Sequence, residues 1–363
     1  MNESPQPSVR PAGLKAPVIR IGAVQWVKRN LFNGVFNSLL TVVTLLFLYW
    51  TVPPFVKWAF LDSLWLSSAE QCRAASGACW SIIPANLRFI IFGFYPYELH
   101  WRPFVAMLLL VALLLYSRNR DHWKKSLAWM WIGGLIVMGT LMKGGIFGMP
   151  PVDSDQWGGL PLTLMLSVFG MVAAYPLGIV LALGRRSKMP AIRTISILYI
   201  ELIRGVPLIS MLFMSAVLFP LFLPEGITIN KILRAQAAII LFTAAYIAEV
   251  VRGGLQAITR GQYEAAESLG LDYVRKMRLV ILPQALKIVI PPTVGILISA
   301  FKDTSLVVII ALYDILKTTK STLSNPTWMG FSPEAYIFVA LIYFVCCYTM
   351  SSYSRRLEKE LHS

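Results

Sequence analysis

Eight apolar stretches recur along this chain of 363 residues, and they limit its fold more than any other feature. The hydrocarbon core of a bilayer is about 30 Å thick and takes about 20 helical residues to cross. In lipid, only helices and closed barrels satisfy their backbone hydrogen bonds. The stretches therefore predict an all-α integral membrane protein with about eight transmembrane helices. They are Val35–Trp50 with an extension towards Phe60, Pro103–Ser117, Leu127–Met142, Gly159–Gly184, Ile195–Leu223, Ala235–Val251, Ile288–Leu312 and Ala335–Met350.

The composition excludes a soluble fold. Only 14% of the residues are charged and 56% are hydrophobic, whereas soluble domains carry about 25% charged residues. No small-residue cleavage site follows the first apolar stretch, so we interpret it as a retained span and not as a removed signal peptide.

The distribution of positive charge predicts the orientation. With the N-terminus inside, the cytoplasmic segments hold 22 of the 33 Lys and Arg, the outer segments and their edges hold nine, and Arg204 and Lys302 lie inside spans. Cytoplasmic loops of membrane proteins carry the excess of Lys and Arg, so both termini are expected in the cytoplasm. The same distribution explains the formal net charge of +15 without a nucleic-acid partner.

The sequence contains no pattern for a resident metal or nucleotide. The three His lie at polar segment ends or in the tail, and the four Cys lack the spacing of zinc ligands. The Gly-Lys-Ser/Thr tripeptide of a Walker A loop does not occur. We therefore expect no cofactor, and we expect transport by this chain and no catalysis.

Changes in hydropathy predict four segments. Residues 1–30 form a cytoplasmic tail, residues 31–155 a three-span extension with an outer loop near 60–102, residues 156–356 a five-span core, and residues 357–363 a second tail. The core spans are rich in Pro and Gly, which membrane helices tolerate beside cavities and close helix contacts. Broken helices along a transport pathway and ordinary kinks are the two interpretations.

The longest cytoplasmic loop between spans, residues 252–287, is amphipathic. The pattern predicts a helix at Tyr263–Leu269, a break at Gly270, a second helix at Tyr273–Ile281 and a stop at Pro283. Two helices joined in this way would form an elbow that offers a partner an apolar and acidic surface. A solvated linker is the alternative.

The loop also contains the spaced residues of a known motif. It resembles the EAA loop of ATP-binding-cassette (ABC) importer permeases, which usually has Ile at the position of Val280. In that family the loop is the coupling helix that docks into a groove of the ATPase subunit, and the resemblance implies this role for the matching residues. These residues are Glu264, Ala265, Ala266, Gly270, Leu282 and Pro283.

Neighbouring motifs within residues 157–356 narrow the resemblance. The segments "ELIRGVPL" (Glu201–Leu208), "YIAEVVRGGLQAI" (Tyr246–Ile258), "GQYEAAESLGL" (Gly261–Leu271) and "FKDTSLV" (Phe301–Val307) are similar to polar amino acid permeases of this group. Outside the core, "VKRNLF", "VPPFVKWAF", "GACW" and "WRPF" are similar to one permease subunit of general L-amino acid importers, as is "GRRSKMP".

The resemblance implies a type I ABC importer permease in the bacterial inner membrane. The expected partners are a second, similar permease subunit, two cytoplasmic ATPase subunits, a periplasmic amino acid binding protein, the L-amino acid substrate and membrane lipid. The alternative hypothesis is an ion-coupled secondary transporter, which would have no use for the elbow. A membrane enzyme is a weaker alternative, because the sequence has no catalytic constellation.

Ionisable residues inside spans indicate the substrate pathway, because each costs about 2.5–3.5 kcal/mol at the centre of a membrane helix. Arg204 lies about nine residues into the fifth predicted span, one turn after Glu201. Its planar guanidinium suits a substrate carboxylate, and a self-satisfied pair with Glu201 is the alternative. Four polar residues interrupt the seventh span, and their charges either line the pathway or bridge to another helix. They are Lys302, Asp303, Thr304 and Ser305.

Two further pairs have structural interpretations. Glu249 and Arg252, at positions i and i+3 near the cytoplasmic end of the sixth span, are expected to form an interfacial ion pair. Cys72 and Cys79 lie in the outer loop, where the periplasm is oxidising, and are expected to form a disulfide.

Overall fold

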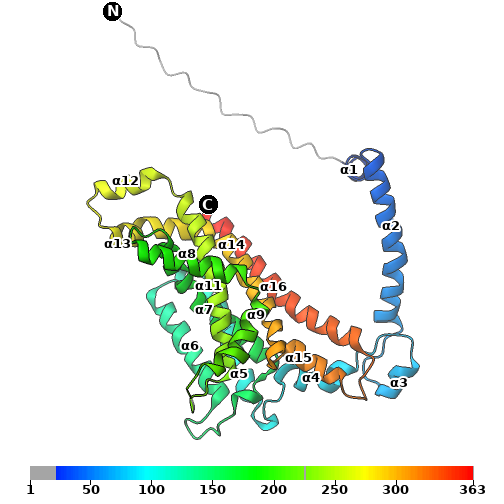
Figure 1. The fold of residues 1–363 in the computed structure, drawn as a ribbon. Coiled ribbons are helices and arrows are strands. Elements are labelled where there is room, and N and C mark those ends of the chain that lie inside the picture. Colours follow the sequence, from blue (N-terminus) through cyan, green and yellow to red (C-terminus); the bar gives the residue numbers. More distant parts are fainter. Residues whose placement is uncertain (1–21, 225, 363) are drawn as a thin grey trace, which may run out of the picture. The chain divides into compact units, whose positions relative to one another are not determined.

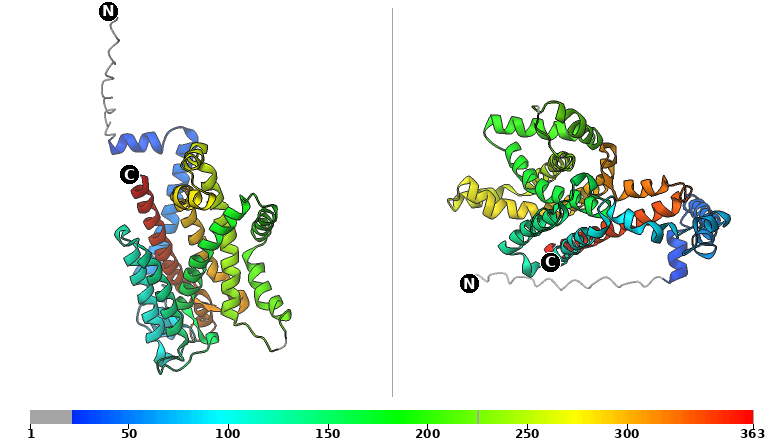
Figure 2. Two further views of the ribbon diagram at one scale, coloured as in Figure 1. Left: turned by 90° about the vertical axis from the view of Figure 1, so that its left-hand side faces the viewer. Right: turned by 90° about the horizontal axis from the view of Figure 1, so that it is seen from below.

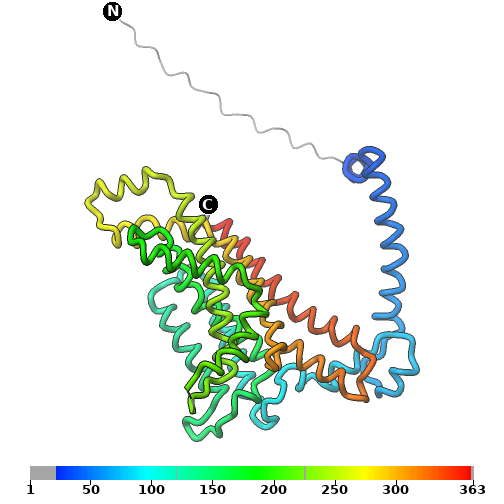
Figure 3. The backbone as a smooth tube through the Cα atoms, viewed as in Figure 1, coloured from blue at the N-terminus to red at the C-terminus, as the bar shows by residue number. Residues whose placement is uncertain are grey.

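The computed structural model describes residues 22–224 and 226–362, and helices form almost all the regular structure of these residues. Figures 1 and 3 trace the chain. Short π-helical turns lie at Lys57–Leu61, Met214–Leu218 and Lys276–Ile281, 3₁₀ turns at Tyr97–Leu99, Arg120–His122, Ser154–Gln156 and Thr304–Ile310, and a two-residue strand β1 at Tyr313–Asp314. The α-helices are α1 Ala23–Asn30, α2 Val35–Val56, α3 Ala69–Ala74, α4 Ile82–Phe92, α5 Trp101–Ser117, α6 Lys125–Lys143, α7 Gly159–Arg185, α8 Pro190–Gly205, α9 Leu208–Phe213, α10 Phe219–Leu221, α11 Lys231–Ala257, α12 Arg260–Ser268, α13 Tyr273–Arg275, α14 Leu282–Asp303, α15 Ile315–Leu323 and α16 Ser332–His362.

Among the described residues, seven helical runs are long and apolar enough to cross a membrane, and a bent pair of helices brings the number to eight. This confirms the predicted all-α membrane fold. The seven runs are Val35–Leu61, Tyr97–Ser117, Lys125–Lys143, Gly159–Arg185, Lys231–Ala257, Tyr273–Ile310 and Ser332–Glu360.

The fifth predicted span, Ile195–Leu223, is not one continuous helix, which corrects the prediction. α8 ends at Gly205, and the helical run Leu208–Leu221 continues from it at an angle of 103°. Val206 is extended (φ −108°, ψ 133°), because the ring of Pro207 disfavours helical backbone in the residue before it. α8 lies across the end of the bundle that also carries α12 and α13 (Figures 1 and 2).

The chain divides into two compact units. The first contains the described part of residues 1–63 together with Ala75–Ala78. Its main element is α2, which is apolar around its whole circumference and has no buried residue, as expected for a helix that faces lipid. Within this unit α1 lies across the end of α2 (Figure 2).

The second unit contains residues 64–74 and 79–363, and its core is built on α7, α11 and α14. Two glycines allow these helices to approach closely, as is common in membranes. A Cβ atom on Gly178 of α7 would lie 2.6 Å from Cγ2 of Ile247, and one on Gly254 of α11 would lie 2.3 Å from Cγ1 of Val289. α5 and α6 pack against α7 through a cluster that includes Leu164.

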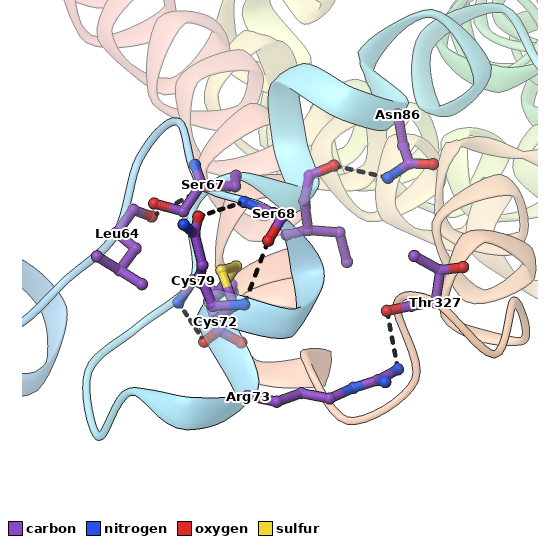
Figure 4. Close-up of a disulfide and its surroundings, with 12 residues drawn as sticks. Leu64, Ser67, Ser68, Cys72, Arg73, Cys79, Asn86 and Thr327 are labelled. Atoms are coloured by element: carbon purple, nitrogen blue, oxygen red, sulfur yellow. Dashed lines mark hydrogen bonds between the residues drawn. A yellow bond between two sulfur atoms is a disulfide. The ribbon is translucent and has the colours of Figure 1, made fainter.

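The predicted outer loop near residues 60–102 contains α3 and α4, and α4 packs against α15, α7 and α16. The predicted disulfide is confirmed, since Cys72 and Cys79 are bonded and their Cα atoms are 5.5 Å apart. Figure 4 shows Arg73 beside the disulfide and close to Thr327. The guanidinium of Arg73 donates to the carbonyl oxygens of Pro326 and Thr327 at 2.5 and 3.1 Å. The disulfide-bonded segment is thereby attached to the loop before α16.

Candidate functional site

The cytoplasmic elbow has the two helices that the sequence predicts. α12 ends before Gly270, whose φ of +70° favours glycine, and the side chain of Asp272 accepts the backbone N–H of Arg275 at 2.7 Å to begin the next helix. Figure 1 shows α12 and α13 projecting from one end of the second unit.

The predicted stop at Pro283 is wrong. The helix that begins at Tyr273 passes through a π-helical turn and continues into α14 without a gap, so the span runs over Tyr273–Ile310. Pro283 directly follows the π-helical turn Lys276–Ile281, and such local changes of helix geometry allow membrane helices to tolerate a proline, which lacks a backbone N–H. Leu282, beside it, packs on the main core cluster.

The elbow has one buried and one exposed side. Ala266 is 2% exposed, whereas Glu264, Ala265 and Gly270 are exposed. Leu269 is 79% exposed. The motif residues of α12 and its end therefore separate into Ala266, which is buried, and an exposed set beside the apolar side chain of Leu269.

Polar contacts attach α12 to the transmembrane helices. The hydroxyl of Tyr263 donates to the carbonyl oxygen of Leu255 at 3.1 Å and lies 2.9 Å from Nη1 of Arg186, the residue that follows α7. Arg186 also donates to the same carbonyl at 2.8 Å. Lys276 donates to the carboxylate of Glu267, and this contact lowers the pKa of Glu267. α12 is thus attached to the ends of α7 and α11.

Three guanidinium groups surround one carboxylate where α7, α8 and α11 meet. Oε2 of Glu249 lies 3.3 Å from Nη1 of Arg185 and 3.8 Å from Nη1 of Arg204, and it accepts Nε–H of Arg252 at 3.0 Å. Arg185 also pairs with Glu201 at 2.9 Å. These five residues form the Glu249 cluster, which carries one excess positive charge.

The Arg204–Glu201 pair, the alternative that the sequence left open, is not formed: Glu201 pairs with Arg185. Among the described residues, the carboxylate within ion-pair distance of Arg204 is Glu249, and Arg204 also lies over the ring of Tyr246 at 5.6 Å. The expected Glu249–Arg252 pair is present, but as part of a larger cluster. Because the carboxylate that Arg204 faces also binds Arg185, the last residue of α7, Arg204 lies near the cytoplasmic end of the bundle and not in the middle of a span.

The second set of candidate residues lies elsewhere. Lys302 and Asp303 are the last residues of α14, and Thr304 and Ser305 open the following 3₁₀ turn. Lys302 is exposed and Asp303 half-buried, and no ion pair of either is found in the described ranges. Thr304 is fully buried and donates to the carbonyl of Phe301 at 2.7 Å. The structure therefore does not bring this set together with Arg204.

Sequence reasoning missed the roles of two adjacent arginines, Arg185 as the last residue of α7 and Arg186 directly after it. Arg185 binds the Glu249 cluster and Arg186 binds the elbow. A pair of basic residues at the cytoplasmic end of a span is ordinary, so only their contacts reveal the role. Within residues 22–224 and 226–362, no three His, Cys, Asp or Glu side chains are grouped as metal ligands.

Comparison with known proteins agrees with this architecture. The chain is 46% identical to the inner membrane amino-acid ABC transporter permease protein YhdY of Escherichia coli (strain K12), over 94% of each chain. It is 39% identical to the glutamate/glutamine/aspartate/asparagine transport system permease protein BztC of Rhodobacter capsulatus, over 95% of each.

Among solved structures, a crystal structure of an amino acid ABC transporter with histidines matches 56% of this chain and 92% of that one, at 33% identity and a TM-score of 0.50. The family described as the binding-protein-dependent transport system inner membrane component matches residues 174–363. The chain therefore belongs to the family of inner membrane components of binding-protein-dependent transport systems.

Proposed function

We propose that this chain is the permease subunit of a bacterial ABC importer for polar or general L-amino acids. The observation that carries the proposal is the elbow of α12 and α13, a projection whose outward residues, Glu264, Ala265, Leu269 and Gly270, are exposed. ABC importers of this family work with ATPase subunits and a solute-binding protein, and the names of the relatives YhdY and BztC support amino acids as the cargo.

The outward side of the elbow is the surface that fits an ATPase subunit. Glu264 supplies charge, Ala265 and Gly270 leave room for close approach, and Leu269 supplies an apolar contact at the tip. Leu282 and Pro283 are proposed to act indirectly. They lie where the second helix of the elbow continues into α14 without a break, and so they link the elbow to the transmembrane span. Movement of the ATPase would thus be transmitted to a transmembrane helix directly.

The contacts of the α7 end suggest how that movement reaches the pathway. Arg186 holds Tyr263 of the elbow, while its neighbour Arg185 holds Glu201 and Glu249. A displacement of α12 therefore acts on α7, α8 and α11 together. In this mechanism the ATPase subunits close, the cores of two permease subunits rock against each other, and the pathway opens to the outside.

Two polar positions at different depths would then contact the substrate in sequence. A substrate arriving from the periplasm would meet Lys302, Asp303, Thr304 and Ser305, which lie in the outer half of the span that begins at the elbow. The Glu249 cluster, with Arg204 and Glu201, lies at the cytoplasmic end. Its excess positive charge suits the carboxylate that every amino acid carries.

We propose a complex of this chain with a second, similar permease subunit, two ATPase subunits and a periplasmic binding protein. The chain itself is proposed to have no enzymatic activity, because ATP hydrolysis belongs to the ATPase subunits. Uptake of labelled amino acids into vesicles, with and without ATP and these partners, tests the function. Uptake that persists without ATP and collapses when the ion gradient is removed would support the secondary transporter instead.

A variant of the elbow keeps the test specific. Glu264→Lys should abolish ATP-driven uptake while the subunit still inserts into the membrane. Lys28→Gln, which removes an exposed charge of α1, should leave uptake unchanged. Equal uptake by wild-type and Glu264→Lys vesicles would contradict the assignment of the elbow.

A further inference from the structure

A groove of about 450 Å³ opens between the cytoplasmic ends of α5 and α16. It is lined by Leu115, Arg118, Asn119, Arg356 and Glu360. Both helices belong to the second unit, and the last turns of α16 can be followed beside α5 in Figure 2. The groove lies apart from the elbow and from the Glu249 cluster.

The groove carries excess positive charge. Nε of Arg356 donates to the carboxylate of Glu360 at 2.7 Å, which offsets one charge of each sign. For Arg118, which is exposed, no carboxylate lies within ion-pair distance in the part of the chain that the structure describes. The adjoining segments 118–125 and 355–360 contain seven basic and three acidic residues. An anion entering the groove therefore meets an available guanidinium.

The depth of the groove matches the headgroup layer of a bilayer. Arg118 directly follows Ser117, the last residue of α5. Arg356 lies six residues beyond Met350, where the last apolar stretch ends, and six residues of helix rise about 9 Å. Polar headgroups add about 5–7 Å on each side of the hydrocarbon core. Arg118 therefore lies in this layer, and Arg356 lies just beyond it, from where its long side chain can reach back to the lipid phosphates.

The surroundings of the groove have the character of a membrane interface. Leu115, one turn inside the span, is 62% exposed. The ring of Tyr116 stacks on His122 at 3.9 Å, and Nε1–H of Trp123 donates to the carbonyl oxygen of Ser117 at 2.9 Å. Aromatic side chains with a polar group favour this boundary between lipid tails and water.

We propose that the groove binds the phosphodiester headgroup of an anionic phospholipid from the cytoplasmic leaflet. Arg118 presents its fork to two phosphate oxygens, Arg356 supplies a second positive charge, and Leu115 contacts the start of the acyl chains. Basic pockets at the cytoplasmic side of membrane helices suit such headgroups. A headgroup with an ammonium group, as in phosphatidylcholine, would bring a positive charge against the arginines and bind more weakly.

Native mass spectrometry of the full-length transporter complex, depleted of lipid and titrated with phosphatidylglycerol, tests the proposal. Each of Arg118→Gln and Arg356→Gln should weaken phosphatidylglycerol retention about fivefold, the effect of one basic residue at a membrane surface. Glu360→Gln should strengthen retention, because it removes the negative charge of the groove. A variant that merely folds poorly would not retain more phosphatidylglycerol, so this expected increase separates lipid binding from loss of structure.

The matched control is Arg193→Gln, which removes one exposed positive charge from α8 outside the groove and should leave retention unchanged. Parallel titrations with phosphatidylcholine and with inorganic phosphate identify the ligand. Equal retention of both lipids, equal loss in the control, or unchanged retention in both groove variants would overturn the proposal. Displacement of phosphatidylglycerol by inorganic phosphate at similar concentration would assign the groove to free phosphate instead.

Discussion

Replacing Glu249 by Gln tests whether one carboxylate holds the cytoplasmic ends of three helices together. Gln has nearly the same shape, so the packing is kept while the negative charge disappears. The guanidinium groups of Arg185, Arg204 and Arg252 would then lose the carboxylate that they share and would repel one another. Glu201 would be the remaining negative charge of the cluster.

The expected size of the effect follows from the contacts. A hydrogen bond to a charged group contributes about 1.5–3 kcal/mol, and removing one partner of a fully buried ion pair costs about 3–5 kcal/mol. The side chain of Glu249 is 24% exposed, so water screens part of the repulsion and we expect a loss of about 2 kcal/mol. For a chain of this size such a loss lowers the melting temperature by about 3 °C.

The assay is thermal unfolding of the purified complex, followed by tryptophan fluorescence. Glu201→Gln is the matched control, because it makes the same chemical change in the same cluster. Glu201 is 55% exposed and pairs with Arg185 alone among the described residues, so its loss should cost about 0–1 kcal/mol. If Glu249→Gln melts at the wild-type temperature, or is lowered no more than Glu201→Gln, the cluster does not hold these helices.

Three further predictions concern the elbow, the outer side and the topology. Gly270→Trp, at an exposed position with positive φ, should prevent co-purification of the ATPase and abolish uptake; normal uptake would contradict the coupling role. Burial raises the pKa of Asp314 from 3.8 to about 6, so the folded state binds more protons and stability should fall as pH rises from about 4 to about 6. Asp314→Asn, which can also cap α15, should remove this slope in melting temperature measured from pH 4 to pH 7. A membrane-impermeant thiol reagent added outside should label Ser324→Cys and not Lys188→Cys, and the reverse pattern would contradict the orientation.

The spans and the elbow could be predicted because their signals are local. Apolar runs of sufficient length indicate membrane helices whatever their neighbours are, and Gly270 beside two amphipathic segments indicates a helix end. The disulfide followed from topology, since it required only that Cys72 and Cys79 lie near each other on the oxidising side.

The bend at Pro207 and the continuation through Pro283 show where local signals fail. Both prolines follow helical sequence, yet α8 ends just before Pro207, whereas the helical run Tyr273–Ile310 continues through Pro283. Whether the helix ends or continues at a proline depends on whether the residue before it can leave the helical conformation without losing packing contacts. Val206 can, because it lies at the corner between α8 and α9, whereas Leu282 packs on the core.

The Glu249 cluster could be predicted only in part. The i, i+3 spacing on one helix identifies the contact of Glu249 with Arg252, but Arg185 is 64 residues away in sequence and comes from another helix. Likewise, the spacing of Glu201 and Arg204 suggested a pair that the fold does not form. Each side chain has a partner on a different helix, and sequence spacing contains no information about that choice.

Arg204→Lys separates a substrate-binding arginine from a structural one. Nη1 of Arg204 lies 3.8 Å from Glu249, an ion-pair distance that an ammonium can also satisfy, while Arg252 supplies the short hydrogen bonds. If Arg204 only balances charge, Lys should preserve both melting temperature and uptake.

If Arg204 binds a carboxylate with its planar fork, uptake per assembled complex should fall about tenfold to hundredfold, the loss of about 1.5–3 kcal/mol, with the melting temperature unchanged. Arg252→Lys is the contrasting variant, because the loss of its hydrogen bonds to Glu249 should lower the melting temperature. Unchanged uptake in Arg204→Lys would therefore assign Arg204 to the framework of the cytoplasmic end and remove it from the substrate pathway.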